Sequence, residues 1–228
     1  MTQALQNPPK NIVLAITGAS GAIYALRLLQ VLVAGEMRVH LTISPSARLV
    51  LLQELRFDLD LDRLRPEELP LHPDAALWPK LSPAMADVLA LRTAGNNPAG
   101  QITYHHYDDL MAPIASGSFL TSGMVICPCS GSTLGAVVHG TGENLIHRAA
   151  SVHLKERRKL VVVPRETPLS TIQLENMRRA AEAGAVVLPA MPGFYHGVNS
   201  LGDLVDFVVA RILDQLGIEN TLMHRWGT

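Results

Sequence analysis

Short apolar runs rich in β-branched residues, most of them ended by glycine, proline or serine, alternate along this chain with segments of helical periodicity. The predicted strands, of which the second alternates polar and apolar residues, are 11–17, 37–44, 124–128, 159–164 and 185–190. The predicted helices are 20–34, 45–56, 131–140, 143–157, 170–183 and 201–216. Strand, helix and strand in succession predict an α/β fold, a doubly wound parallel sheet with helices on both faces.

The length of the chain favours a single domain. With 228 residues, 48% of them hydrophobic, it can bury most of its surface in one core. Residues 57–100 interrupt the alternation with six prolines and a cluster of charges, and we interpret them as a surface excursion or short helices. The predicted organisation is an N-terminal arm at 1–10, one α/β domain at 11–218 and a C-terminal tail at 219–228.

Charge and cysteine content narrow the functional classes. The formal net charge is −1, so no overall field favours nucleic acid or an anionic membrane as a partner. No stretch is apolar for long enough to cross a membrane, and the first residues lack a secretory signal, so we expect a cytoplasmic protein. Cys127 and Cys129 are too close for a comfortable disulfide and too few for a zinc site, so we expect reduced thiols and no metal.

The stretch TGASGA at 17–22 joins the first predicted strand to the first helix. Gly18 and Gly21 are three positions apart and do not match the G-x-G-x-x-G fingerprint of dinucleotide sites. The second strand ends at Ser44 and not at the acidic residue that would bind an adenosine ribose, which disfavours a pyridine-nucleotide oxidoreductase. A helix beginning at Ser20 would suit the phosphate of a mononucleotide such as FMN. The alternative left open is that Ser20 is only a helix cap.

A second turn of glycine and serine strengthens the phosphate hypothesis. The stretch CSGST at 129–133 follows another buried strand and opens a helix with three hydroxyl side chains, Ser130, Ser132 and Thr133. Turns at the carboxyl ends of parallel strands flank the crevice where open α/β sheets bind ligands. We therefore expect both turns to line one crevice.

Charged residues around the fourth predicted strand indicate a second anion site and an acid. Arg148 and Lys155 are seven apart, so on a helix they project from nearly one face and could hold a dianion. Arg165 and Glu166 directly follow the strand, where the carboxylate could shuttle a proton, although an ordinary surface ion pair is the alternative. Arg211 lies in an otherwise apolar helix and is expected to have a partner.

Six motifs, taken in order, resemble those of the UbiX-type flavin prenyltransferases. They are TGASGA, MAPIASGS, CPCSGSTL, NLIHRAASVHLKERRKLVVVPRETPLS, GAVVLPAMPGFYH and the terminal RWG. Together they span nearly the whole chain apart from the N-terminal arm and 57–100.

The resemblance implies a flavodoxin-like, Rossmann-like three-layer subunit in a large homo-oligomer, often a dodecamer, with active sites at subunit contacts. It implies a transferase that moves the dimethylallyl group of dimethylallyl phosphate to N5 and C6 of reduced FMN, without a metal ion. The products would be phosphate and prenylated FMN. A UbiD-type decarboxylase would receive this cofactor, in ubiquinone biosynthesis or aromatic acid decarboxylation.

Carried over position by position, the resemblance assigns three overlapping sets of residues. The implied contacts to FMN are Gly18, Ala19, Ser20, Ser44, Ala115, Ser116, Ser130, Gly131, Ser132, Thr133 and Arg165. The residues implied around the prenyl group and its phosphate are Arg148, Lys155, Tyr195, Arg211 and Trp226. Glu166 is implied to transfer a proton, and the other implied catalytic residues are Ser20, Glu54, Lys155 and Tyr195.

Two rival functions remain open from the sequence. A flavin-dependent cysteine decarboxylase of the phosphopantothenoylcysteine type uses a P-A-M-N motif, whereas this chain has PAMPGFYH at 189–196, with Pro192 in place of the asparagine. A non-catalytic FMN carrier or accessory protein for a decarboxylase would need no second phosphate site, and the cations named above argue against it.

Overall fold

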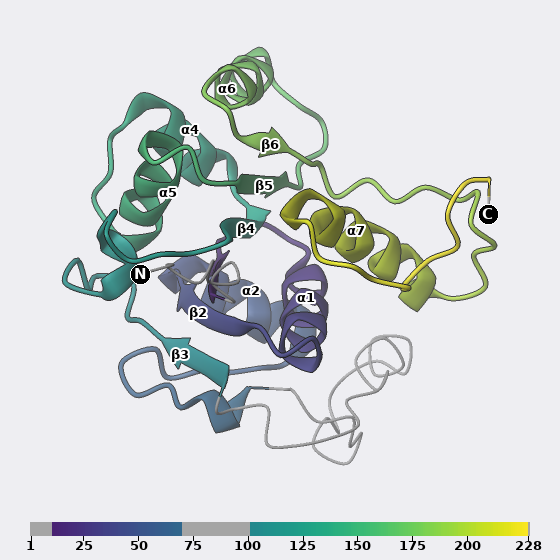
Figure 1. The fold of residues 1–228 in the computed structure, drawn as a ribbon, viewed down its shortest axis with the longest axis horizontal. Coiled ribbons are helices and arrows are strands. Elements are labelled where there is room, and N and C mark those ends of the chain that lie inside the picture. Colours follow the sequence, from purple (N-terminus) through teal and green to yellow (C-terminus); the bar gives the residue numbers. More distant parts are fainter. Residues whose placement is uncertain (1–10, 70–100, 228) are drawn as a thin grey trace, which may run out of the picture.

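The computed structural model describes residues 11–69 and 101–227, and its core is a six-stranded parallel sheet. The strands follow the order β3-β2-β1-β4-β5-β6 across the sheet (Figure 1). Their bounds are β1 Asn11–Ile16, β2 Arg38–Ile43, β3 Ile102–Tyr104, β4 Gly123–Cys129, β5 Leu160–Pro164 and β6 Val186–Val187. After β3 the chain returns to place β4 beside β1, so the strand order reverses between β1 and β4. This reversal is the switch point of a doubly wound sheet.

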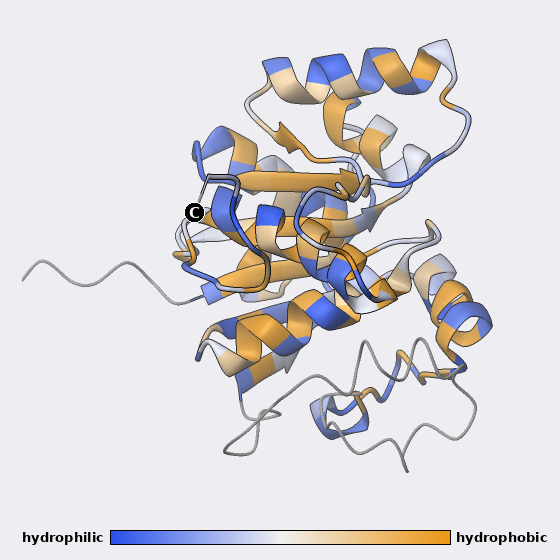
Figure 2. Cartoon of the chain, turned by 90° about the vertical axis from the view of Figure 1, so that its right-hand side faces the viewer, coloured by the Kyte–Doolittle hydropathy of each residue, from blue (hydrophilic) through white to orange (hydrophobic). Residues whose placement is uncertain are grey.

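Helices cover both faces of the sheet, and hydrophobic residues fill the strands between them (Figure 2). Successive residues of β1 point to opposite faces: Ile12 and Leu14 pack in one core with α1, α2 and α7, whereas Val13 packs in the other with α4 and α5. None of the described helices is long and apolar enough to cross a membrane. Their bounds are α1 Ala22–Ala34, α2 Pro45–Leu55, α4 Gly131–His139, α5 Leu145–Lys155, α6 Thr171–Glu182 and α7 Leu201–Leu216.

The predicted three-layer α/β fold is confirmed, and two strands differ from the sequence prediction. The run at 185–190 forms only the short β6, although Leu188 and Ala190 still donate backbone hydrogen bonds to β5 at 2.9 and 3.0 Å. The strand β3 was not predicted. It has three residues at the edge of the sheet, of which only Ile102 is buried, and so it carries too short a pattern to recognise.

The segment at 57–69 is less peripheral than the sequence suggested. It holds one short 3₁₀ helix, Pro66–Glu68, but it also buries three leucines in the core, Leu59, Leu64 and Leu69. A charged residue directly precedes each of these leucines in the sequence. The segment therefore has a polar pattern that does not predict their burial. The rest of the predicted excursion, 70–100, and the predicted arm, 1–10, lie outside the described residues.

A buried ion pair joins α1 to α7, which lie side by side (Figure 1). Arg27 donates through Nε to Oδ1 of Asp206 at 2.6 Å and through Nη2 to Oδ2 at 3.0 Å. The two side chains are only 8% and 12% exposed. Because a two-point bond fixes direction as well as distance, this pair adds an orienting contact to the apolar core that α1 and α7 share.

His40 of β2 and His105, which follows β3, form a buried pair of imidazoles. Nδ1 of His40 lies 3.0 Å from Nε2 of His105, and the two rings are stacked. Burial, and then the neighbouring His105 and Arg38, lower the pKa of His40 from 6.5 to about 4. Burial also lowers the pKa of His105. Both rings are therefore neutral in the folded protein at neutral pH.

The free energy of unfolding is expected to fall as the pH drops from 6.5 towards 4. Above pH 6.5, His40 is neutral in both the folded and the unfolded state. Between pH 6.5 and 4, His40 binds a proton in the unfolded chain but not in the folded protein. His40→Gln should flatten this part of the pH profile by on the order of 2 kcal/mol. Urea unfolding at a series of pH values measures the effect, with exposed His139→Gln as the control. An unchanged slope in His40→Gln would show that other groups carry the acid sensitivity.

Candidate functional site

The two predicted turns meet at the switch point, beyond the carboxyl ends of β1 and β4. The buried hydroxyl of Thr17 donates to the Pro128 carbonyl at 2.7 Å and accepts from the Ser130 N–H at 2.8 Å. These bonds tie the turn after β1 to the turn after β4. The structure thus brings the two turns together, as the sequence predicted.

The helix α4 begins at this switch point with hydroxyl groups in its first turn. Ser130 is its cap: Oγ of Ser130 accepts from the Thr133 N–H at 3.3 Å and lies 3.1 Å from Oγ of Ser132. The first N–H groups of a helix have no partner within the helix, and the helix dipole favours an anion beside them. This end of α4, which starts at Gly131, therefore fits a phosphate monoester such as that of FMN.

The N-terminus of α1 differs from the prediction. The helix begins at Ala22, and Gly21 before it takes the left-handed conformation with φ 110°, so Ser20 is not the cap. The N–H groups of Gly21 and Ala22 donate to the Glu54 carboxylate of α2, at 3.0 and 2.9 Å. The helix dipole stabilises a carboxylate at this end. Glu54 therefore occupies the anion position that the sequence assigned to a phosphate, and Ser20 is exposed on the preceding turn.

Packing against α2 explains the small residues of the turn after β1. A Cβ at Gly18 would lie 2.6 Å from Cβ of Ser46, at the start of α2, and Ala19 is buried. Ser44 is the cap of α2, because its Oγ accepts from the Ala47 N–H at 3.1 Å. These predicted flavin contacts therefore also hold α2 close to the turn after β1.

Arg165 and Glu166 follow β5 and take different partners. Nε of Arg165 donates to the Ser20 carbonyl at 3.1 Å. Oε2 of Glu166 accepts from Nε2 of Gln173 at 3.3 Å, while Oε1 of Gln173 accepts from the Ser170 N–H at 2.8 Å. Sequence reasoning missed Gln173, although the S-x-x-Q pattern is a capping-box signal for the start of α6. Because the cap fixes its amide, Gln173 presents a donor to Glu166.

Arg148 and Lys155 lie on α5, as the sequence predicted, and form a second group with the loop before β4. Nε of Arg148 donates to the Ala115 carbonyl at 3.0 Å. Nζ of Lys155 pairs with the Glu156 carboxylate. Ser116, next to Ala115, is exposed. The predicted loop residues and the predicted dianion-binding residues are therefore neighbours.

Within one chain, Lys155 lies near the amino-terminal ends of the strands and Glu166 near their carboxyl ends. Lys155 ends α5 shortly before β5 begins at Leu160, and Glu166 follows the end of β5 at Pro164. A parallel strand of this length spans roughly 13 Å. One chain therefore does not bring the predicted phosphate-binding lysine and the predicted proton carrier into one site.

Tyr195 and Trp226 form a third group beyond the end of β6. Their rings meet edge to face with centroids 5.5 Å apart, and Tyr195 also contacts Phe207 of α7. Tyr195 is 52% exposed and Trp226 is 82% exposed, and the neighbouring Phe194 and Met191 are exposed too. Exposed apolar side chains gathered in this way are typical of a surface that contacts another chain.

Arg211 on α7 has the partner that its apolar surroundings predicted. Its Nη1 donates to Oδ2 of Asp214 at 2.8 Å. Asp214 also binds Arg225, the residue before Trp226. One carboxylate therefore links Arg211 to the segment that carries the exposed tryptophan.

The thiols of Cys127 and Cys129 are free and buried, as expected. Burial raises the pKa of Cys129 to about 12, and burial together with the neighbouring Cys129 raises that of Cys127. Neither thiol is therefore an active nucleophile near neutral pH. Within 11–69 and 101–227, no three side chains of His, Cys, Asp or Glu are arranged to hold a metal ion.

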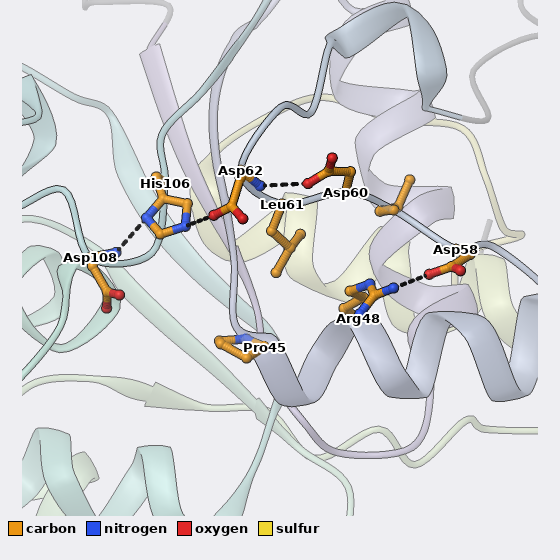
Figure 3. A pocket seen from close by; sticks show the side chains of 9 residues that line it. Pro45, Arg48, Asp58, Asp60, Leu61, Asp62, His106 and Asp108 are labelled. Carbon is orange, nitrogen blue, oxygen red and sulfur yellow. Dashed lines mark hydrogen bonds and ion pairs between the residues drawn. The ribbon is translucent and has the colours of Figure 1, made fainter.

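An acidic hollow beside α2 is a poor match for a phosphate. It has a volume of about 630 Å³, and its lining includes Arg48, His106 and four aspartates, Asp58, Asp60, Asp62 and Asp108 (Figure 3). Arg48 pairs with Asp58, and Nε2 of His106 lies 3.3 Å from Oδ1 of Asp62. The surplus of carboxylates repels anions. The two turns at the switch point, with the first turn of α4, remain the better candidate for binding a phosphate.

Known proteins resemble this chain over nearly its full length. The family described as Flavoprotein matches residues 2–213. The flavin prenyltransferase UbiX of Pseudomonas aeruginosa is 50% identical, over 96% of this chain and 95% of that protein. The structure of a UbiX in complex with FMN and dimethylallyl pyrophosphate is 34% identical with a TM-score of 0.73, over 96% of this chain and 98% of that one. A dodecameric FMN-dependent UbiX-like decarboxylase from Escherichia coli O157:H7 is 36% identical with a TM-score of 0.72, over 96% and 100% of the two chains.

These likenesses cover both halves of the sheet and both turns at the switch point. The resemblance inferred from the six motifs is confirmed by them, as is the flavodoxin-like architecture. This chain belongs to the flavoprotein family and, within it, to the UbiX-type flavin prenyltransferases.

Proposed function

We propose that this chain is a flavin prenyltransferase that joins the dimethylallyl group of dimethylallyl phosphate to N5 and C6 of reduced FMN and releases phosphate. The observation that carries the proposal is its likeness along the full chain to proteins of that name, at up to 50% identity. The product is prenylated FMN, and we expect a UbiD-type decarboxylase to receive it.

The crevice at the switch point suits the flavin. The first turn of α4 offers N–H groups and the hydroxyls of Ser132 and Thr133 to a phosphate. Arg165, held against the Ser20 carbonyl, adds a cation at the turn after β1. The reduced flavin supplies the nucleophilic N5. The residues of this chain orient the flavin and stabilise the charge of the departing phosphate.

Release of phosphate from carbon needs fixed positive charge. A phosphate monoester leaves slowly unless cations and donors meet its developing charge. Arg148, Lys155 and Arg211 supply the cations, and the hydroxyl of Tyr195 supplies a further donor. The ring of Trp226 can stabilise a positively charged prenyl group by roughly 1–2 kcal/mol when water is excluded.

Glu166 is suited to carry the proton. Gln173 donates to its Oε2, which keeps that oxygen an acceptor. The carboxylate of Glu166 can then take up and return the proton. The carboxylate of Glu54 reaches from α2 to the turn after β1, where Ser20 can donate to the prenyl phosphate.

We further propose that copies of this chain complete one another's sites in a homo-oligomer. Lys155 and Glu166 lie at opposite ends of the strands, and Tyr195 and Trp226 expose their rings. A site that uses all four must draw them from more than one copy. The dodecameric state of the relative from Escherichia coli supports a dodecamer. Two free thiols support a reducing, cytoplasmic setting.

Anaerobic incubation with reduced FMN and dimethylallyl phosphate tests the function directly. Mass spectrometry of the flavin should detect the added dimethylallyl unit, and a colorimetric assay should detect the released phosphate. A parallel reaction with dimethylallyl diphosphate tests the choice of leaving group. Flavin that binds without gaining mass would favour the carrier. Carbon dioxide released from a cysteine derivative would favour the cysteine decarboxylase.

A further inference from the structure

Asp214, in the last turn of α7, binds three side chains at once. Its carboxylate accepts from Nη1 of Arg211 at 2.8 Å, from Nδ2 of Asn220 at 3.1 Å and from the two Nη atoms of Arg225 at 2.8 and 3.1 Å. The side chain of Asp214 is 17% exposed, whereas those of Arg211 and Arg225 are 43% and 44% exposed. The shielded carboxylate is therefore the point around which the two arginines are arranged.

The chain beyond α7 depends on this carboxylate for its path. Gly217 ends the helix in the left-handed conformation, with φ 71°. Arg225 then returns to Asp214, and the next residue, Trp226, reaches Tyr195. Because Trp226 is 82% exposed, burial contributes little to its placement. The two-point bond of Arg225 is the adjacent restraint.

The guanidinium of Arg211 keeps donors that a phosphate could accept. Two guanidinium groups, those of Arg211 and Arg225, meet at this one carboxylate. Hydrogen bonding from Arg225 lowers the pKa of Asp214, so the carboxylate stays ionised at neutral pH. Asp214 engages only Nη1 of Arg211, so Nε and Nη2 of that guanidinium remain donors for another acceptor.

We propose that Asp214 is a positioning residue for the prenyl-phosphate side of the site. It aims the guanidinium of Arg211 and, through Arg225, it holds the ring of Trp226 in place. The inference rests on the proposed function, which gives Arg211 and Trp226 their roles. It adds that the segment after α7 is held ready for substrate by one carboxylate.

Asp214→Asn keeps the shape of the side chain and removes its charge. The KM for dimethylallyl phosphate is expected to rise about tenfold, while the affinity for FMN stays within about twofold. Glu182→Gln is the matched control, because it removes an exposed carboxylate from an ion pair on α6. It should leave both constants unchanged.

Fluorescence provides a readout that does not depend on turnover. The chain has two tryptophans, so in a Trp78→Phe background the anisotropy of the emission reports the local motion of Trp226. Asp214→Asn and Arg225→Gln should each lower that anisotropy. The double variant should match Asp214→Asn alone, since both changes act through one ion pair. If Asp214→Asn does not assemble, Arg225→Gln still tests the anchor.

The outcomes separate this inference from the proposed function. Prenylation by the unsubstituted enzyme, together with an unchanged KM and unchanged anisotropy in Asp214→Asn, overturns the inference and leaves the function standing. Failure of the unsubstituted enzyme to prenylate FMN overturns the function. In that case an unchanged anisotropy also overturns the anchoring of Trp226, and a lowered one supports it.

Discussion

Replacing Asp206 by asparagine is expected to lower the free energy of unfolding by about 3–5 kcal/mol. The change keeps the shape of the side chain but removes the carboxylate that neutralises the buried guanidinium of Arg27. The two side chains are only 8% and 12% exposed, so water cannot replace the lost partner well. The loss should also loosen α7, the helix that carries Arg211.

Urea unfolding at a fixed protein concentration measures this effect, because subunit association contributes to stability. Glu175→Gln removes a more exposed carboxylate that pairs with arginines on α6, and it should lower the free energy of unfolding far less than Asp206→Asn. Arg27→Met combined with Asp206→Leu should recover most of the stability, because both charges are removed together. A loss no larger than that of the control would show that the pair does not hold α7.

Lys155→Ala and Glu166→Gln are each expected to slow prenyl transfer about 10²–10³-fold, with FMN still bound. In the proposed function, Lys155 meets the charge of the departing phosphate and Glu166 moves the proton. Because the two residues lie at opposite ends of the strands, a site that uses both takes them from different copies. Mixed oligomers of the two inactive variants should therefore regain activity.

Co-expression of the two variants, followed by the rate of gain in flavin mass, measures the recovery. With equal amounts and random assembly, about a quarter of the sites should contain both intact residues. Lys155→Ala mixed with the double variant Lys155→Ala/Glu166→Gln is the control, since no site in it can recover a lysine. Equal rates in the two mixtures would place both residues in the same copy.

Features that depend on near neighbours in the sequence were predictable. Ser130 caps α4 at the predicted turn because a serine hydroxyl can reach the N–H three residues on. Arg211 has the expected partner because Asp214 lies three residues further along the same helix. The β-branched runs located most of the strands for the same reason: each pattern is complete within a few residues.

Features that depend on distant segments were not predictable. The carboxylate that caps α1 comes from Glu54, which lies 33 positions from Gly21. No local sequence pattern predicts this contact. Lys155 and Glu166 are close in sequence, yet the full length of β5 separates them. The role of Gln173 joins a local helix cap to a carboxylate on another segment, and only the local half could be recognised.

The carboxylate of Glu54 gives the crevice a polarity. One helix end at the switch point, that of α4, has N–H groups to offer, whereas the end of α1 already holds a negative charge supplied by the protein. FMN carries its phosphate at one extremity of the molecule. Because Glu54 already takes the N–H groups of α1, we expect the flavin phosphate to bind at α4, so an acid built into the scaffold decides which helix end receives that end of the ligand.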